Sequence, residues 1–141
     1  MDDLHRGLKP FVGVAPVAIG TTGTGQVGKI IDRRGYSGVE FYIAYGTITA
    51  TAAAYTVTVK EGDATGSMTS AADSVLQGTE AAAGVAAAST RTSGVSKNVV
   101  KRVGYIGTKR YVQCGVKSTT TATTPVAIVA IGQPYSFPVA T

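Results

Sequence analysis

YSGVEFYIAYGTIT, residues 36–49, alternates large apolar side chains with smaller or polar ones. The large side chains share one parity: Val39, Phe41, Ile43 and Tyr45. A period of two places such residues on one face of a β-strand. Residues 55–61, YTVTVKE, repeat the pattern. The two stretches therefore predict strands that each turn one face toward a common core.

Weaker strand signals lie on both sides of these two stretches. They are residues 11–19 (FVGVAPVAI), 95–106 (VSKNVVKRVGYI), 109–117 (KRYVQCGVK) and 125–132 (PVAIVAIG). Pro16 lacks a ladder donor and indicates an edge strand. Residues 125–132 are apolar on both parities, which is typical of a central strand. Seven or eight short strands with turns between them predict an all-β chain, specifically a β-sandwich or jelly roll.

The composition supports a single β domain spanning residues 1–141. Ala (20), Thr (20), Gly (18) and Val (18) make up 76 of the 141 residues, a mixture that favours sheets and turns over helical bundles. No apolar run approaches 18 residues, so no membrane helix is expected. One cysteine and one histidine leave neither an internal disulfide nor a zinc site. We expect a protein made in a reducing cytoplasm.

Three segments depart from the strand pattern. Residues 1–16 are interpreted as an N-terminal arm that leads into an edge strand. Residues 64–94 are rich in Ala, Ser, Thr and Gly and form a long excursion, too poor in bulky residues to build a core of its own. Residues 133–141, QPYSFPVAT, predict an extended C-terminal arm with Tyr135 and Phe137 as aromatic anchors.

Charge is distributed unevenly along the chain. Residues 1–80 carry six Lys or Arg and eight Asp or Glu, whereas residues 81–141 carry seven basic residues and no acidic one. Such asymmetry predicts a basic face for docking a protein partner. The candidate contact residues are Lys9, Phe11, Arg91, Lys97, Lys101, Arg102, Lys109, Arg110, Tyr135 and Phe137.

No motif predicts catalysis, a cofactor or a metal site. Residues 23–29, GTGQVGK, match the spacing of phosphate-binding loops, but Ile30 stands where a magnesium-binding Ser or Thr is needed, so a hairpin loop is the better interpretation. Glu61 and Asp63 are interpreted as solvated turn acids. Cys114 falls on the apolar parity of its strand and is expected to be an inert core residue.

Five stretches carry a resemblance to a known family. They are GYSGVEFYIAYGTI (35–48), AYTVTVKEGD (54–63), LQGTEAA (76–82), KRVGYIGTKRYVQCGV (101–116) and TPVAIVAIGQPYSFP (124–138). In their order and spacing the chain resembles the cement, or decoration, proteins of tailed bacteriophages, in particular the jelly-roll cement proteins of Bordetella-type short-tailed phages. The resemblance implies a virion protein that binds the outside of an HK97-type capsid across capsomer boundaries.

The resemblance also implies partners and a location. The major capsid protein and other copies of the chain are the expected partners, with a homodimer expected before a trimer. The protein would be made in the host bacterial cytoplasm and reside on the capsid exterior, without nucleic acid or membrane. Two alternatives stay open: a nucleic-acid-binding β-barrel that uses its basic residues and Tyr111, and a tail-tube or head–tail joining protein.

Overall fold

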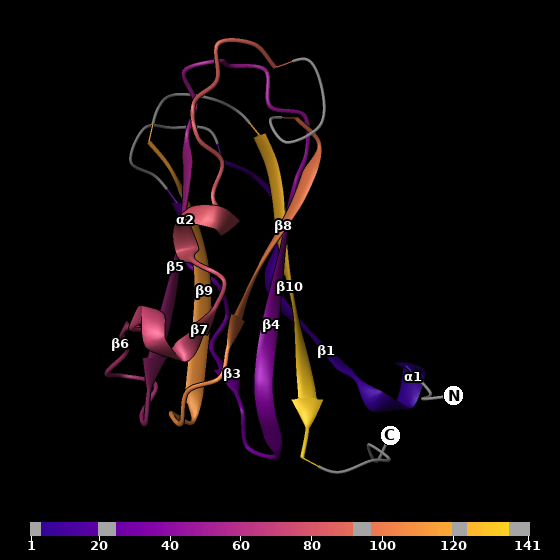
Figure 1. The fold of residues 1–141 in the computed structure, drawn as a ribbon, viewed down its shortest axis with the longest axis vertical. Helices are drawn as coiled ribbons and strands as arrows, with labels where there is room; N and C mark the ends of the chain where they lie inside the picture. The colour runs from indigo at the N-terminus through magenta and orange to yellow at the C-terminus, as the bar shows by residue number, and fades with distance from the viewer. Residues whose placement is uncertain (1–3, 20–24, 92–96, 120–123, 136–141) are drawn as a thin grey trace.

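Two antiparallel β-sheets pack against each other as two layers (Figure 1). This computed structural model describes residues 4–19, 25–91, 97–119 and 124–135. It confirms the all-β sandwich that the alternating stretches predict. Within the described residues, no helix has the length and apolar character needed to cross a membrane.

The first layer, sheet A, contains five strands. In spatial order they are β1 (Lys9–Ile19), β10 (Thr124–Pro134), β4 (Tyr36–Tyr45), β8 (Val99–Tyr105) and β7 (Leu76–Gln77). The N-terminal and C-terminal strands are thus neighbours, although more than 100 residues separate them in sequence. The register of β1 shifts between Val14 and Val17, on either side of Pro16, as expected for a proline in an edge strand.

The second layer, sheet B, is built around the pair of β5 (Tyr55–Gly62) and β9 (Tyr111–Ser118). Three two-residue strands complete it: β2 (Gly25–Gln26) and β3 (Ile31–Asp32) beside β9, and β6 (Thr69–Ser70) beside β5. These short strands have no detectable period of two, because two residues are too few to show one.

The core lies between the two inner faces. Phe41 and Ile43 of β4 are fully buried, as the alternation predicts, and they face the layer that holds Val59 and Cys114. Burial raises the pKa of the Cys114 thiol to about 12, so the thiolate form is disfavoured and Cys114 serves as a small apolar core residue.

Residues 64–91 cover one edge of the sandwich rather than forming a second core. They contain β6, the 3-10 turn η1 (Asp73–Val75), β7 and the helix α2 (Glu80–Ala83). Thr79 caps α2 by accepting a hydrogen bond from the backbone of Ala82 at 3.0 Å. Glu80 accepts from the backbone N–H of Val59, so its carboxylate satisfies a donor on the open edge of β5. Tyr45 fixes the helix by donating to the Ala83 carbonyl at 2.9 Å.

The ends of the chain differ in detail from the predicted arms. β1 begins at Lys9 and follows the short helix α1 (Leu4–Gly7), so much of the predicted N-terminal segment is an edge strand. β10 continues to Pro134, which pairs with Tyr36. The strand therefore extends two residues into the segment that the sequence analysis assigns to a C-terminal arm.

Candidate contact surfaces

Four residues gather where β1 begins and β10 ends, and we call them the terminal cluster: Lys9, Phe11, Tyr36 and Tyr135. The rings of Phe11 and Tyr36 meet edge to face, with centroids 5.5 Å apart. Gly132 lies beneath them, and a Cβ there would come within 2.7 Å of the Tyr36 ring. Tyr135 is 71 % exposed. The cluster thus combines a fixed aromatic pair with a free tyrosine and an exposed lysine.

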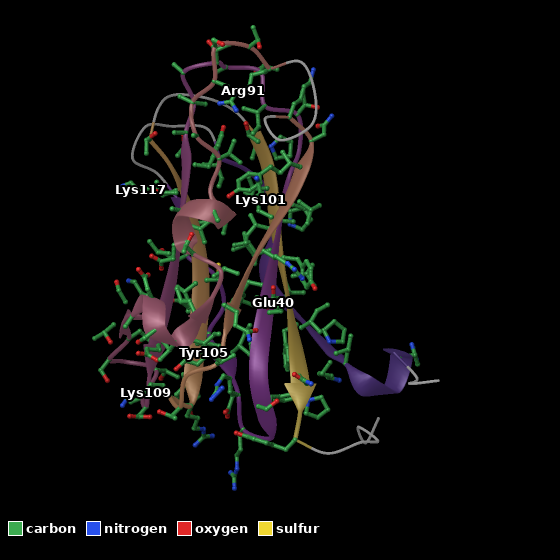
Figure 2. All side chains as sticks on the ribbon, viewed as in Figure 1. Glu40, Arg91, Lys101, Tyr105, Lys109 and Lys117 are labelled. Atoms are coloured by element: carbon green, nitrogen blue, oxygen red, sulfur yellow. The ribbon has the colours of Figure 1, made fainter. Side chains whose placement is uncertain are left out.

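The predicted basic residues do not form one face. Figure 2 places Lys101 and Lys117 toward one end of the long axis and Lys109 at the other. Arg102 lies on β8, where its Nε is 3.8 Å from the Glu40 carboxylate. Lys97 is half-buried just before that strand. The described cations belong to different strands and to both sheets, so the structure does not bring them together on one strand or sheet, and their contact with a partner stays a prediction.

Several cations are also neutralised by acids from the first half of the chain. Lys109 Nζ lies 2.5 Å from Asp63 Oδ2. Arg110 donates to both oxygens of Asp32, from Nε at 3.1 Å and from Nη2 at 2.7 Å. These pairs form because β9, from the basic half, lies between strands from the first half. Sequence charge alone does not reveal this pairing.

The Asp32–Arg110 pair gives an expected pH dependence. Hydrogen bonds from Arg110 and from the backbone of Arg34 lower the pKa of Asp32 to about 2 from its ordinary 3.8. A lowered pKa stabilises the fold above pH 4, and this contribution is lost as the pH falls toward 2. Asp32→Asn is expected to flatten the decline of the unfolding free energy in that window, by at most about 1 kcal/mol because the pair is exposed. Urea titrations at several pH values measure it.

Arg110→Ala provides the matched control for this prediction. If the pair is the cause, Asp32→Asn adds little to the pH dependence once Arg110 is gone. An undiminished effect of Asp32→Asn in the Arg110→Ala background contradicts the assignment.

Arg91 serves the fold rather than a partner. It is buried, and its guanidinium donates to the carbonyls of Ala50 at 3.3 Å, Thr51 at 3.4 Å and Ala53. The prediction of Arg91 as a contact residue is therefore corrected, because the surrounding loop uses its donors. Phe137 lies outside the described residues.

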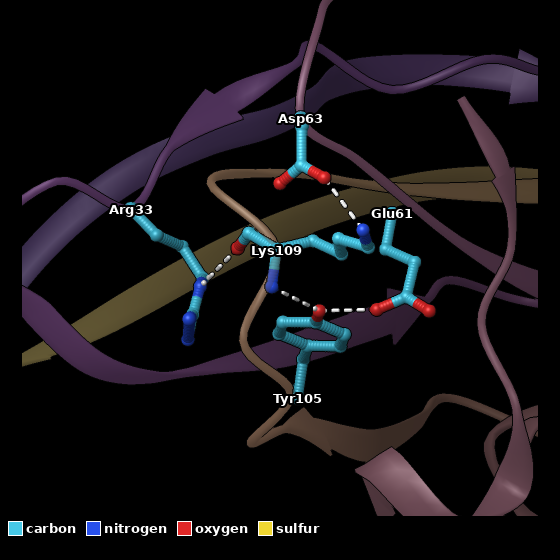
Figure 3. A network of polar contacts seen from close by, with 5 residues as sticks. All are labelled: Arg33, Glu61, Asp63, Tyr105 and Lys109. Atoms are coloured by element: carbon cyan, nitrogen blue, oxygen red, sulfur yellow. Dashed lines mark hydrogen bonds and ion pairs between the residues drawn. The ribbon is translucent and has the colours of Figure 1, made fainter. Parts of the chain in front are cut away.

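A polar network that includes Tyr105 and Lys109 (Figure 3) lies toward the end of the sandwich far from Arg91 (Figure 2). Arg33 is buried and donates through Nε to the Lys109 carbonyl at 3.0 Å and through Nη2 to the Gly107 carbonyl at 2.6 Å. The backbone N–H of Lys109 donates to the Tyr105 hydroxyl, which in turn donates to Glu61. Burial, reinforced by this bond to Glu61, raises the pKa of Tyr105 to about 12. Glu61 is thus a half-buried acceptor, not the solvated turn acid that the sequence suggested.

The described part of the glycine-rich loop, residues 25–29, packs along a strand, whereas Gly23 and Thr24 lie outside the described residues. Gly25 and Gln26 form β2 beside β9, and no helix follows before β3. A Cβ on Gly28 would overlap the carbonyl oxygen of Cys114, so glycine is needed for the close approach of two backbones. Among the described residues, no three His, Cys, Asp or Glu side chains are grouped for a metal ion.

The outer face of sheet A is a surface that the sequence analysis missed. Val12, Val129 and Tyr42 are cross-strand neighbours on it, and Val12 and Val129 are 52 % and 44 % exposed. Val100 on β8 is 65 % exposed. The apolar run at residues 125–132 could have predicted this surface, because a strand that is apolar on both parities is typically covered on both faces. In the single chain only one face of β10 is covered.

The sequence matches no protein-family model and no curated protein. Similar solved structures are those of infectious bursal disease virus. The Gx strain structure has a TM-score of 0.52 at 9 % identity over 93 % of this chain and 33 % of that chain. The VP2 subviral particle has a TM-score of 0.52 at 9 % identity over 90 % of this chain and 32 % of that one. This chain spans about a third of those proteins, and the likeness defines a shared sandwich fold.

Proposed function

We propose that the protein is a structural component of a virus particle, a cement protein that binds the outside of an HK97-type bacteriophage capsid and joins neighbouring capsomers. The observation that carries the proposal is the fold: nearly the whole length of this chain superposes on about a third of a viral capsid protein. The sequence resemblance to phage cement proteins narrows the role. Four of the five stretches that carry it contain the long strands β4, β5 and β10 and most of β8 and β9.

The proposed mechanism is adhesion and involves no catalytic residue, cofactor or metal. A rigid sandwich holds its contact side chains in place, so little conformational entropy is lost on binding. Each contact is modest, and an oligomer that spans several capsid subunits raises the avidity by a factor of about 10² or more. The partners in this proposal are the major capsid protein and other copies of the chain.

The terminal cluster is the proposed capsid contact. Exposed tyrosines with an adjacent cation are typical hot-spot residues of interfaces. Tyr135 stands clear of the body, and the Phe11–Tyr36 pair holds its surroundings in place. Lys9 supplies a positive charge for an acidic capsid surface.

We expect the double variant Lys9→Glu with Tyr135→Ala to fold normally and to need an about 10-fold or higher concentration for half-occupancy of capsids. The measurement is co-sedimentation with shells assembled from the major capsid protein of the same virus. Lys117→Ala, an exposed change toward the other end of the long axis, is the control and should bind like the unaltered protein. Unchanged occupancy by the double variant would refute this contact. Six-fold rings in negative stain would instead favour a tail-tube or joining protein.

A further inference from the structure

We propose that the outer face of sheet A is the surface through which two copies of the chain pack face to face about a two-fold axis. The inference does not depend on the proposed place on a capsid, because it concerns the purified protein alone. It starts from a contradiction within one strand: β10 has the apolar composition of a strand covered on both sides, but one side is open.

Strand pairing arranges this face in rows that cross the sheet. One row contains Val12, Val129, Tyr42 and Arg102. The next row toward the terminal cluster contains Pro10, Ile131, Glu40 and Gly104. Cross-strand partners share a face, so all eight positions lie on the same outer surface.

The two rows complement each other. A groove of about 500 Å³ crosses the face; Leu8, Ile131, Glu40 and Ile106 line it on the side of the terminal cluster, and Tyr42 and Arg102 line it from the other row. The exposed valines Val12, Val100 and Val129 lie mainly on the other half of the face. Consider a two-fold axis that is parallel to the sheet, perpendicular to its strands and midway between the two rows. This axis places each half of the face of one copy against the opposite half of the face of the second copy.

This operation also matches apolar and charged groups. Val129 of one copy falls over Ile131 of the second, and Val100 falls over the half-exposed Ile106. Arg102 falls over Gly104 of the second copy, the position above which that copy's Glu40 carboxylate and Gln77 side chain lie. One positive and one negative group on each copy give two intermolecular pairs, as an isologous interface requires.

The size of the face suits a stable dimer. Four strands about 4.8 Å apart, with lengths of about 25–35 Å, give a flat area of roughly 600 Å². Side chains present more accessible surface than the flat sheet below them. The face therefore approaches the ~800 Å² that each partner buries in a standard interface. Two aligned sheets also pack readily, as they do inside sandwich domains.

Light scattering coupled to size-exclusion chromatography of the full chain tests the inference. The unaltered protein should have the mass of a dimer, and Val129→Lys should shift it to a monomer with an unchanged circular dichroism spectrum. Thr58→Lys, on the exposed face of β5 in sheet B, is the matched control and should stay dimeric. A monomer at all concentrations, a trimer, or a dimer indifferent to Val129→Lys would overturn the inference.

A charge exchange tests the register itself. In the Arg102→Glu variant both positions of the proposed intermolecular pair, 40 and 102, are acidic on each copy, and in the Glu40→Arg variant both are basic. Like charges then face each other in the dimer, so each variant alone should dimerise at least 10-fold more weakly. An equimolar mixture of the two variants should recover a heterodimer, because every facing pair is then opposite in sign. If the mixture stays as weak as its components, the proposed register is wrong. Shell binding is measured separately, so failure here leaves the capsid proposal standing.

Discussion

Replacing Arg33 with methionine is expected to lower the free energy of unfolding by about 3 kcal/mol or more. Arg33 donates to three backbone carbonyls, those of Lys109, Gly107 and Ser37, and its guanidinium lies 4.9 Å from the centre of the Tyr105 ring. Methionine fills a similar volume but donates nothing. The partly or fully buried carbonyls then lose their partners, which costs about 1–3 kcal/mol each.

Urea unfolding of the two proteins at one concentration measures the effect of Arg33→Met. Arg34→Met is the matched control, since the neighbouring arginine is exposed and should change stability by less than about 0.5 kcal/mol. Arg33→Lys is expected to recover only part of the loss, because an ammonium cannot reproduce the fork of a guanidinium. Equal effects at positions 33 and 34 would contradict the structural role.

The second large effect is expected for Phe41→Ala, at about 3–5 kcal/mol. Phe41 is fully buried in the middle of β4, where it packs between the sheets. The loss combines reduced apolar burial with a cavity that the stiff β-branched residues around it cannot fill. Phe41→Leu keeps most of the volume and should cost less than half as much.

Thr58→Ala is the comparison for Phe41→Ala, because Thr58 lies on the exposed face of a central strand. It should change stability by less than about 0.5 kcal/mol in the same urea titrations. A loss below about 1 kcal/mol for Phe41→Ala would mean that the sheets do not meet at β4.

The inner faces of the long strands could be predicted from sequence. Large apolar residues recur at every second position from Val39 to Tyr45 in β4 and from Tyr55 to Val59 in β5, and in both strands this parity is the buried one. Cys114 was placed on the core side by the same rule, and it is fully buried. The composition of residues 64–94 predicts a segment without a core of its own, and its described part, residues 64–91, contains only short elements that lie against the sandwich.

Strand partners and buried polar groups could not be predicted. β1 pairs with β10 across the length of the chain, and such pairing is decided by tertiary contacts that leave no local pattern. Arg33 and Arg91 look like surface cations in the sequence, but both are buried because carbonyls of distant loops converge on them. The basic half of the chain suggested one docking face, yet sheet pairing distributes its charges and places Asp32 and Asp63 beside two of them.

Two separate surfaces of the sandwich are therefore proposed to bind two different partners. The terminal cluster is proposed for the capsid, and the outer face of sheet A for a second copy. A dimer of this kind would present two terminal clusters, so each unit could engage two neighbouring capsid subunits and gain avidity without new contacts.

Quantitative mass spectrometry of purified, intact particles of the virus that encodes this chain tests the central claim most directly. The account predicts peptides of this protein at a copy number comparable to that of the major capsid protein, and their loss after brief protease treatment that leaves the shell intact. Intact heads that lack the protein, while the infected-cell lysate contains it, would contradict a role on the capsid exterior.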